Sequence, residues 1–207
     1  MIKAKTLDWD KGEGLLPAII QDATTLQVLM LGYMNKQSFK LTQETGIVHF
    51  YSRSRQEIWK KGATSGNTFK LVKLQVDCDN DTILAEVEPK GPACHLGHVT
   101  CFGDDPGPGL GFLGHLKRII RQRREENVKG SYVRGLFEKA PKRPAQKVGE
   151  EGVEVAMAAV SESDEALTEE AADLVFHLMV LLESRDLEME DVIKVLRKRH
   201  AVRAAEK

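Results

Sequence analysis

Glycine and proline crowd one short segment near the middle of the chain, and this segment limits what the chain can fold into. Residues 103–111 read G-D-D-P-G-P-G-L-G, with four glycines and two prolines in nine residues. Proline lacks a backbone donor and glycine adds backbone freedom, so neither a helix nor a strand is expected here. The spacing of the glycines does not match a dinucleotide-binding loop. We therefore predict a linker at residues 103–111 between two domains, residues 1–102 and 112–207.

Residues 1–102 carry the pattern of a mainly β domain. They hold eight of the twelve aromatic residues, both tryptophans and all three cysteines. Short runs of β-branched and aromatic residues predict strands of a mainly antiparallel sheet, with one short helix at about residues 35–42. The predicted strands are residues 18–21, 25–31, 47–51, 69–76 and 82–87. In the fourth of these, Val72, Leu74 and Val76 alternate with polar side chains, which predicts one buried and one exposed face.

Residues 112–207 have a helical period instead. Apolar residues recur at steps of three and four through Leu167, Ala171, Leu174, Leu178 and Leu181. Such spacing places them on one face of a helix that packs against other helices. Further helices are predicted over residues 112–124, 146–160 and 188–203. The second domain is therefore expected to be an all-α bundle of about four helices.

The charge balance and the hydropathy exclude two classes of partner. Lys plus Arg number 30 and Asp plus Glu number 31, so the chain lacks the basic excess typical of a duplex nucleic-acid binder. The longest apolar stretch, residues 174–182, is nine residues broken by His177, about half of what a bilayer requires. We expect neither nucleic acid nor a membrane as a partner. Residues 1–14 are polar and show no cleavable leader, so we expect a cytoplasmic protein.

Three aspartates, Asp77, Asp79 and Asp81, alternate with other residues at the end of a predicted strand. In extended backbone their side chains project to one side, where like charges repel each other unless a cation binds. A magnesium site is one interpretation, and a solvated acidic turn is the other. A calcium-binding EF-hand loop is disfavoured, because Thr82 stands where that loop requires glycine and the flanking residues predict strands.

Three cysteines, Cys78, Cys94 and Cys101, form a set of soft metal ligands. Their odd number and the absence of a leader favour free thiols or metal ligands over disulfides. Three thiolates bind tetrahedral Zn²⁺ and leave the fourth position for water, which zinc activates at neutral pH. His95 and His98 stand nearby, and either is a candidate fourth ligand or general base. The alternatives are cysteines of the core and a closed structural zinc site.

A basic stretch, residues 51–67, mixes arginine, hydroxyl and glycine residues in a way that suits phosphate binding. It contains no Walker motif, and a solvated basic loop is an equally good interpretation. The candidate substrate-binding residues are Arg53, Arg55, Trp59, Lys61, Gly62, Ser65, Gly66 and Asn67.

The first domain resembles phosphoribosyl-AMP cyclohydrolase of histidine biosynthesis over residues 15–102. The resemblance rests on L-M-L-G-Y-M-N at residues 29–35, Y-S-R-S-R at 51–55, W-x-K-G-x-x-S-G-N at 59–67, D-C-D-N-D at 77–81, and C-H-x-G with C-F at 94–102. In that family, water attacks carbon 6 of an adenine ring and opens the ring. The resemblance implies zinc on the three cysteines, with Cys78 supplied across a homodimer interface. It also implies magnesium on the three aspartates and proton transfer by His95.

Carboxylates gather on one face of the predicted helix over residues 146–160. Glu150, Glu151 and Glu154 fall within an arc of about 100° around the helix axis. Glu170 and Asp173 lie three residues apart on the next helix. Two such helices packed antiparallel would present four or five carboxylates to Mg²⁺, which would in turn hold a triphosphate. The alternative is a solvated acidic face.

The second domain resembles phosphoribosyl-ATP pyrophosphohydrolase, a relative of the MazG-type nucleotide pyrophosphatases. K-x-x-E-E-x-x-E at residues 147–154 and E-x-x-D at 170–173 carry the resemblance, together with Ser131, Tyr132 and L-R-K-R-H at 196–200. It implies a Mg²⁺-dependent attack of water that splits the triphosphate into monophosphate and pyrophosphate. The residues implied are Lys147 in substrate binding and Glu150, Glu151, Glu154, Glu170 and Asp173 in catalysis, the last four also as metal ligands.

The two resemblances fit together, because the product of the second domain is the substrate of the first. We therefore predict a bifunctional hydrolase that uses Zn²⁺ and Mg²⁺. Residues 112–207 convert phosphoribosyl-ATP to phosphoribosyl-AMP, residues 1–102 open the adenine ring of that product, and both domains dimerise. One rival is a zinc-dependent nucleotide deaminase, although the H-x-E motif of those enzymes is absent. The other is a noncatalytic dimerisation module with a closed zinc site and solvated acidic helices.

Overall fold

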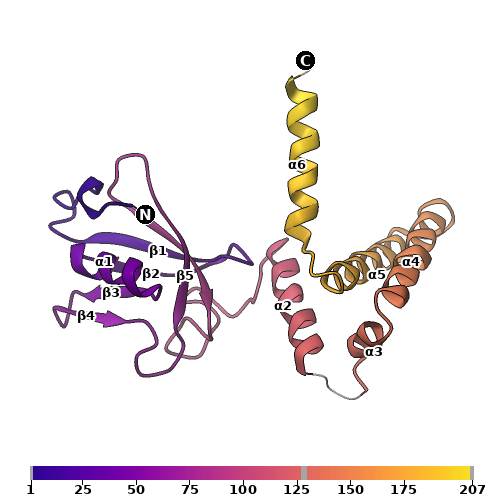
Figure 1. Ribbon diagram of the computed structural model, residues 1–207, viewed down its shortest axis with the longest axis horizontal. Helices are drawn as coiled ribbons and strands as arrows, with labels where there is room; N and C mark the ends of the chain where they lie inside the picture. The colour runs from indigo at the N-terminus through magenta and orange to yellow at the C-terminus, as the bar shows by residue number, and fades with distance from the viewer. Residues whose placement is uncertain (1, 127–129, 206–207) are drawn as a thin grey trace. The chain divides into compact units, whose positions relative to one another are not determined.

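The computed structural model describes residues 2–126 and 130–205, and the chain divides between His115 and Leu116 into two compact units. The first unit contains the β-strands and the second is helical, which confirms the predicted fold classes (Figure 1). The division falls inside helix α2 (Gly111–Glu126), which begins one residue before the predicted helix. Residues 104–110 form bends and turns, as their glycines and prolines predict.

A four-stranded sheet forms the centre of the first unit. Its strands are β1 (Leu16–Asp22), β2 (Val28–Met34), β5 (Phe69–Val76) and β6 (Ile83–Pro89), in the order β2-β1-β6-β5. β1 pairs antiparallel with β2, β5 pairs antiparallel with β6, and β1 runs parallel to β6. The sheet is therefore mainly antiparallel, as predicted.

Helix α1 (Lys36–Thr45) and the hairpin of β3 (His49–Ser52) and β4 (Glu57–Lys60) complete this unit, together with a short 3₁₀ helix, η1 (Ala4–Thr6). A capping box starts α1, because the Asn35 side chain accepts from the Ser38 amide and the Ser38 hydroxyl accepts from the Asn35 amide. Phe50 of β3 lies directly against Gly32 of β2, where an added Cβ would meet the ring at 2.4 Å. The fully buried core side chains include Leu16, Ile20, Met34, Phe39, Phe50, Phe69, Ile83 and Val87.

The second strand starts later than the sequence predicts. Asp22 accepts hydrogen bonds from the amides of Thr24 and Thr25, at 2.7 and 3.1 Å, and folds residues 23–25 into a turn. β2 therefore begins at Val28 rather than at residue 25. The short strand β4 was not predicted, because its four residues include two charged ones and lack a clear alternation.

The prediction for Val72 is wrong because β5 contains a bulge. The pairing with β6 passes from Leu71 to Lys73, so Val72 is left unpaired and is 51% exposed. The bulge moves the buried positions by one residue, and Leu71, Leu74 and Val76 are the side chains that pack against the core. A bulge depends on the pairing of two strands, which the alternation within one strand does not reveal.

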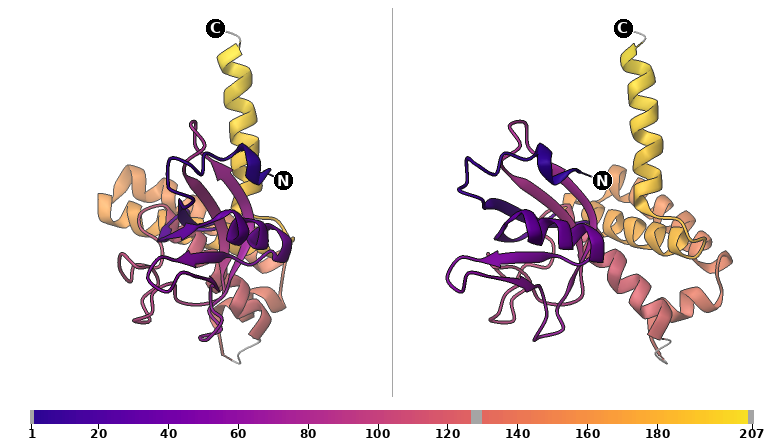
Figure 2. Two further views of the ribbon diagram at one scale, coloured as in Figure 1. Left: turned by 90° about the vertical axis from the view of Figure 1, so that its left-hand side faces the viewer. Right: turned by 60° about the vertical axis from the view of Figure 1, so that its left-hand side comes forward.

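In the described part of the chain, helix α2 is followed by α3 (Tyr132–Glu138), α4 (Lys142–Ser161), α5 (Asp164–Glu183) and α6 (Met189–Ala205). This makes five helices instead of about four, because α3 has only seven residues and shows no periodic stripe. α4 and α5 lie side by side as an antiparallel pair (Figure 2). Ser163 caps α5 by accepting a hydrogen bond from the Ala166 amide.

Apolar surface stays exposed on the α4–α5 pair. Val153, Met157 and Val160 recur about one turn apart on α4 and are 63%, 54% and 80% exposed. The apolar face predicted on α5, from Leu167 to Leu181, is only half-buried. Apolar rows of this size are typical of surfaces that associate with other helices.

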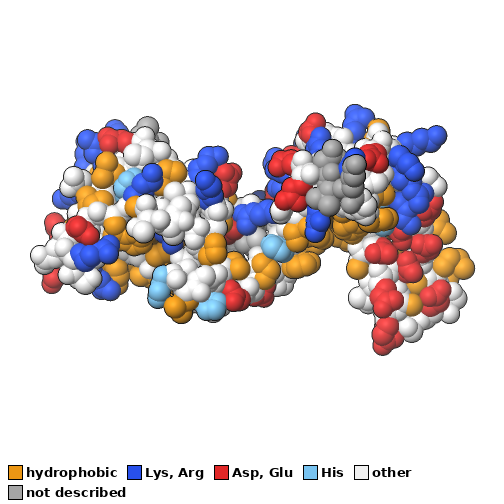
Figure 3. Space-filling view, turned by 90° about the horizontal axis from the view of Figure 1, so that it is seen from below, with side chains coloured by type: hydrophobic (Ala, Val, Ile, Leu, Met, Phe, Trp, Pro, Cys, Tyr) orange, Lys and Arg blue, Asp and Glu red, His pale blue; other side chains and the backbone are white. Residues whose placement is uncertain are grey.

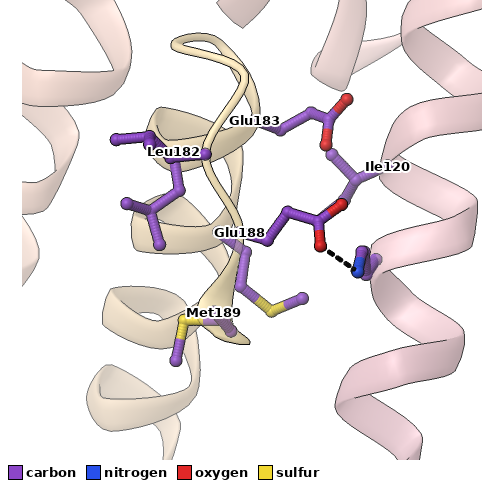
Figure 4. Close-up of a pocket in the computed structure, with 8 residues that line it drawn as sticks. Ile120, Leu182, Glu183, Glu188 and Met189 are labelled. Atoms are coloured by element: carbon purple, nitrogen blue, oxygen red, sulfur yellow. Dashed lines mark hydrogen bonds and ion pairs between the residues drawn. The ribbon is translucent and has the colours of Figure 1, made fainter. Parts of the chain in front are cut away.

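Ion pairs hold α2 against the junction of α5 and α6, and Figure 4 shows the one between Lys117 and Glu188. Glu183 is buried and accepts from Arg121 at 3.1 and 3.0 Å, and Glu188 accepts from Arg121 and Lys117. The cavity between these side chains, which Ile120 also lines, measures about 10 Å³. It has room for no more than about one water molecule, so these contacts pack the helices together rather than form a ligand site. No helix of the described residues combines the length and the apolar character needed to cross a bilayer.

Candidate active sites in the two units

A cleft of about 580 Å³ opens on the first unit between the turn after β4 and the segment that follows β6. It brings together two motifs, residues 59–67 and residues 94–102, that lie far apart in the sequence. The predicted site residues that line it are Arg55, Trp59, Lys61, Gly62, Ser65, Asn67, Cys94, His95 and Cys101. The basic stretch and the cysteine motif thus form one site rather than two.

The turn of residues 61–67 forms one wall of this cleft. Gly62 has a φ of 80°, and an added Cβ would lie 2.5 Å from the carbonyl carbon of Asn67, so a larger residue does not fit. The Gly66 amide donates to the Gly62 carbonyl at 2.9 Å and closes the turn. Gly66 shapes the turn without lining the cleft, whereas Ser65 lines it with an exposed hydroxyl. A tight turn with a hydroxyl and nearby cationic side chains suits a phosphate group.

Cys94 and Cys101 also line this cleft, and the Cys94 sulfur is close enough to affect the Cys101 thiol. The loop between them turns back on itself, because the Cys94 amide donates to the His98 carbonyl, and the Cys101 amide donates to Leu29 of β2. Burial and the neighbouring Cys94 sulfur raise the pKa of the Cys101 thiol. Burial lowers the pKa of Lys61, whose ammonium donates to the Ala93 carbonyl at 2.6 Å, and the two sulfurs oppose this shift. Two neighbouring thiols in one cleft are suited to a soft cation.

Cys78 does not gather with the other two cysteines of the same chain. It precedes β6 and Cys94 follows β6, so a strand roughly 20 Å long, at about 3.3 Å per residue, lies between them along the chain. The three sulfurs do not all lie within 4.8 Å of one another.

The two histidines of the cysteine motif differ in their surroundings. His95 is exposed and lines the cleft. His98 is turned to Asp104, whose carboxylate lies 2.6 Å from its Nδ1 and also accepts from the Val99 amide. Of the two histidines, His95 is therefore the one placed to meet a bound substrate.

Arg53 occupies a second hollow of about 310 Å³ beside the main cleft. Its guanidinium carbon lies 3.8 Å from the centre of the Tyr33 ring, a cation–π contact. Trp59 and Met30 line both hollows. The predicted substrate-binding residues of the first unit thus fall into two adjoining hollows.

The three aspartates lie close together, but in a turn rather than in extended backbone. Asp77, Asp79 and Asp81 each offer an oxygen within 4.8 Å of the others, in the loop that joins β5 to β6. Desolvation in the turn acts to raise the pKa of Asp77. The amides of Thr82 and Asp81 donate to its carboxylate and outweigh this effect, so the pKa of Asp77 falls below its usual value. The extended geometry that we predicted is wrong, although the grouping it predicted is present.

Lys11 approaches this aspartate group from a distant part of the sequence. Its ammonium lies 2.6 Å from Asp79 and 3.1 Å from Asp81. Hydrogen bonds to these two carboxylates raise the pKa of Lys11. A side-chain cation therefore compensates two of the three charges.

A second carboxylate group forms between α4 and α5 in the helical unit. Glu151 and Glu154 of α4 and Glu170 of α5 each offer an oxygen within 4.8 Å of the others. Acidic side chains are prominent over the lobe that α4 and α5 build (Figure 3). Glu151 is the buried member, with a side chain only 3% exposed, and it forms an ion pair with Lys147 one turn earlier. Lys147 also lies 3.2 Å from Glu150.

The charges of this group are not balanced by the protein alone. The hydrogen bond with Lys147 lowers the pKa of Glu151, and burial opposes that shift. The hydrogen bond with Glu151 raises the pKa of Glu154, and desolvation and the Glu151 and Glu170 charges add to the rise. Carboxylates this close repel one another when they are ionised. A divalent cation would relieve that repulsion, so the donors fit Mg²⁺.

Comparison with known proteins assigns a family to each unit. The family model for phosphoribosyl-AMP cyclohydrolase matches residues 30–103, and that for phosphoribosyl-ATP pyrophosphohydrolase matches residues 113–200. A "Histidine biosynthesis bifunctional protein HisIE" from Xanthomonas axonopodis pv. citri is 53% identical over 195 residues, which cover 94% of this chain and 93% of that protein. The chain belongs to the HisIE family. HisIE proteins of Photobacterium profundum and Shigella sonnei are each 48% identical to it, over 94% and 95% of this chain and 97% and 96% of their own lengths.

Membership in the HisIE family confirms the two predicted resemblances. The chain is a bifunctional hydrolase of histidine biosynthesis with a cyclohydrolase domain and a pyrophosphohydrolase domain. The cleft, the aspartate group and the glutamate group each lie within the residues that the corresponding family model matches, whereas Lys11 lies outside them.

Two of the predicted catalytic residues of the HisIE chain stay outside the carboxylate group. Glu150 pairs instead with Arg143, Gln146 and Lys147. Asp173 is exposed, and its backbone carbonyl accepts from the ring of His177. The group therefore holds three carboxylates, where the sequence predicted four or five.

Sequence analysis missed His177 as a site residue. His177 is 3% exposed, lies 3.6 Å from Glu151 and contacts the hydroxyl of Tyr132 at 2.7 Å. The signal was a single polar residue inside an otherwise apolar stretch, four residues after Asp173 on the same helix. Tyr132 was predicted only as part of the resemblance to the pyrophosphohydrolase family, together with Ser131, and not as a site residue.

Proposed function

We propose that the two reactions of this HisIE chain take place at the two sites described above. The carboxylate group of α4 and α5 hydrolyses phosphoribosyl-ATP to phosphoribosyl-AMP and pyrophosphate. The cleft of the first unit then opens the adenine ring of phosphoribosyl-AMP. One observation carries this assignment: the cleft joins two interacting thiols, an exposed histidine and a turn suited to phosphate.

The ring-opening site is proposed to use zinc on Cys94, Cys101 and a third cysteine. Bound zinc would supply a water of lowered pKa. The residues of the chain then have separate tasks. Arg55, Lys61 and the turn containing Ser65 hold a ribose phosphate, and Trp59 offers a face on which the adenine stacks. His95, exposed in the same cleft, takes up and returns the proton.

The third zinc ligand is proposed to be Cys78 of a second copy of the chain. Cys78 does not gather with Cys94 and Cys101 of its own chain, and it is exposed, so it is accessible to a partner. The exposed apolar side chains of α4, Val153, Met157 and Val160, support an association of the helical domains as well. A two-fold homodimer would place each Cys78 against the other chain's cleft and so form two equivalent sites.

Mixing two inactive variants tests this sharing. Cys78→Ser and Cys94→Ser should each lack ring opening, and co-expressed chains that assort at random should recover about a quarter of the wild-type activity. The recovery follows because about half of the dimers are mixed and one of their two sites is intact. The measurement is the ultraviolet change of ring opening. No recovery on mixing, with both variants folded and dimeric, would contradict a shared site.

The proposed metal for both carboxylate groups is Mg²⁺. Oxygen ligands of this type prefer hard divalent cations, and a bound Mg²⁺ would neutralise phosphate charge in the helical site. In the helical unit, Lys147 keeps Glu151 ionised and so available as a ligand. In the first unit, the ammonium of Lys11 competes with the cation for Asp79 and Asp81.

Replacing Lys11 with methionine is expected to tighten cation binding by the aspartate group. The variant removes the competing ammonium, so the Mg²⁺ concentration for half-maximal ring opening should fall several-fold. Lys5→Met is the matched control, because it removes an exposed lysine of the same segment that makes no ion pair with the aspartates. An unchanged Mg²⁺ requirement in Lys11→Met would show that this group does not bind the cation.

The deaminase and the purely structural alternatives predict different products. Supplying phosphoribosyl-ATP to the zinc-loaded protein with Mg²⁺ should release pyrophosphate first and then give the absorbance change of ring opening. A deaminase would release ammonia, and a structural zinc site would give neither absorbance change nor ammonia. The proposed compartment is the cytoplasm, because the three free cysteines are thiols that a reducing environment preserves.

A further inference from the structure

A buried histidine and a tyrosine lie behind the carboxylate group of the helical unit, and the proposed function gives them no task. His177 of α5 is 3% exposed and Glu151 of α4 is 2% exposed. Tyr132, at the start of α3, is 58% exposed but turns its hydroxyl inward to the His177 ring. Helices α3, α5 and α4 thus each contribute one polar side chain to a continuous series of contacts, from Tyr132 through His177 to Glu151.

The contacts of His177 determine which ring nitrogen carries the hydrogen. Nδ1 lies 2.9 Å from the carbonyl oxygen of Asp173, which can only accept, so Nδ1 is the donor. In a neutral imidazole the other nitrogen is then an acceptor, so the Tyr132 hydroxyl donates to Nε2 at 2.7 Å. The Nδ1 atom also lies 3.6 Å from Oε1 of Glu151, so the edge of the ring that carries the hydrogen is close to that carboxylate without a hydrogen bond to it.

Glu151 is therefore held from two sides. Lys147 pairs with it on α4, and the His177 ring faces it from α5. The Glu151 carboxylate also lies close to Glu154 and Glu170, and one oxygen of each of the three lies within 4.8 Å of the others. A metal ligand whose orientation is fixed by a second set of contacts binds its ion more tightly than a free one.

We propose that Tyr132 and His177 are positioning residues that hold the Glu151 carboxylate toward Glu154 and Glu170, and so set the affinity of this group for a divalent cation. This inference rests on the proposed role of the three glutamates as the metal site. Neither residue is proposed to touch substrate.

Tyr132→Phe is the most selective test, because it removes one oxygen from an exposed side chain and keeps the ring against Phe176. Without the hydroxyl, Nε2 loses its donor, and the ring keeps only its hydrogen bond to the Asp173 carbonyl, so its edge is held less firmly against Glu151. The Mg²⁺ concentration for half-maximal pyrophosphate release should rise about tenfold, as for other supporting contacts of metal ligands. At saturating Mg²⁺ the kcat and the KM for phosphoribosyl-ATP should stay within about twofold of wild type.

A binding measurement gives a readout that does not depend on turnover. Mn²⁺ alone is titrated into the full chain and the free ion is followed by its electron paramagnetic resonance signal. Asp79→Asn and Asp81→Asn are present throughout, so that the aspartate group of the first unit contributes little. Adding Tyr132→Phe should weaken Mn²⁺ binding by the same factor as the Mg²⁺ requirement.

Two further variants separate positioning from packing. Phe176→Leu disturbs the ring contacts of both Tyr132 and His177 without touching a polar atom, so it should lower the Tm and leave the Mg²⁺ requirement unchanged. His177→Asn keeps a donor near the Asp173 carbonyl, whereas His177→Leu keeps none. His177→Asn should therefore weaken binding of the metal ion less than His177→Leu does.

The outcomes distinguish this inference from the proposed metal site. If Glu151→Gln raises the Mg²⁺ requirement and Tyr132→Phe does not, the positioning role is wrong while the metal site stands. If Tyr132→Phe raises only the KM for the nucleotide, Tyr132 contacts substrate and the inference is overturned. If Glu151→Gln itself leaves the Mg²⁺ requirement unchanged, the three glutamates are not the metal site and the proposed function of this group fails.

Discussion

Cys94→Ser is expected to abolish ring opening while pyrophosphate release continues at the wild-type rate. The serine hydroxyl is a poor ligand for a soft cation, and the two proposed thiolates that remain, Cys101 and Cys78 of a second copy, are too few for a tetrahedral zinc site. Loss of the metal-activated water should lower ring opening at least about a thousandfold, equivalent to about 4 kcal/mol in the barrier. The measurement supplies phosphoribosyl-AMP for the first unit and phosphoribosyl-ATP for the second, and it records the zinc content of each preparation.

A variant in the same loop provides the control for Cys94→Ser. Leu96 is 69% exposed between Cys94 and His98 and offers no ligand atom, so Leu96→Ala should keep both zinc and ring opening. Equal loss of both activities in Cys94→Ser would contradict the assignment of one reaction to each unit. The structure supports independence, because the cleft lies within the first compact unit and the glutamates lie within the second.

The two fold classes follow from the sequence because each depends on a local period. The alternation of the strands and the three- and four-residue steps of α5 are visible within single segments. The bulge at Val72 depends on pairing between two strands, which the alternation within one strand does not show. The turn that delays β2 is local, but it depends on the side chain of Asp22 accepting from the Thr24 and Thr25 amides, within a run rich in threonine that also favours a strand. The short helix α3 offers too few residues for a period to be read.

The same distinction applies to the sites. The basic turn and the cysteine motif are compact in sequence, and their residues meet in one cleft. Cys78 looks like part of that motif, but the length of β6 separates it from Cys94. Lys11 is 68 residues from Asp79, so no local spacing predicts their contact. His177 was overlooked because a lone histidine in an apolar stretch is usually interpreted as a core residue, and its partner Tyr132 is 45 residues away.

Glu151→Gln should produce the converse effect of Cys94→Ser and abolish pyrophosphate release. The amide has the same shape but no charge, so the buried centre of the group with Glu154 and Glu170 loses a metal ligand. Lys147 would then face a neutral partner at this position. We expect pyrophosphate release at saturating Mg²⁺ to fall about a thousandfold, about 4 kcal/mol in the barrier, with ring opening of supplied phosphoribosyl-AMP unchanged.

Two neighbouring glutamates make this experiment specific. Glu169→Gln changes the charge by the same amount on an exposed position beside Glu170, so it should keep pyrophosphate release near the wild-type rate. Glu150→Gln tests the residue that the sequence placed in catalysis and that the structure pairs with Arg143 and Gln146 instead. Because Glu150 stays outside the oxygens that meet within 4.8 Å, its loss should cost far less than that of Glu151. If Glu150→Gln is as damaging as Glu151→Gln, the metal site includes Glu150 once substrate binds, and the three-carboxylate group is incomplete as the description of the working site.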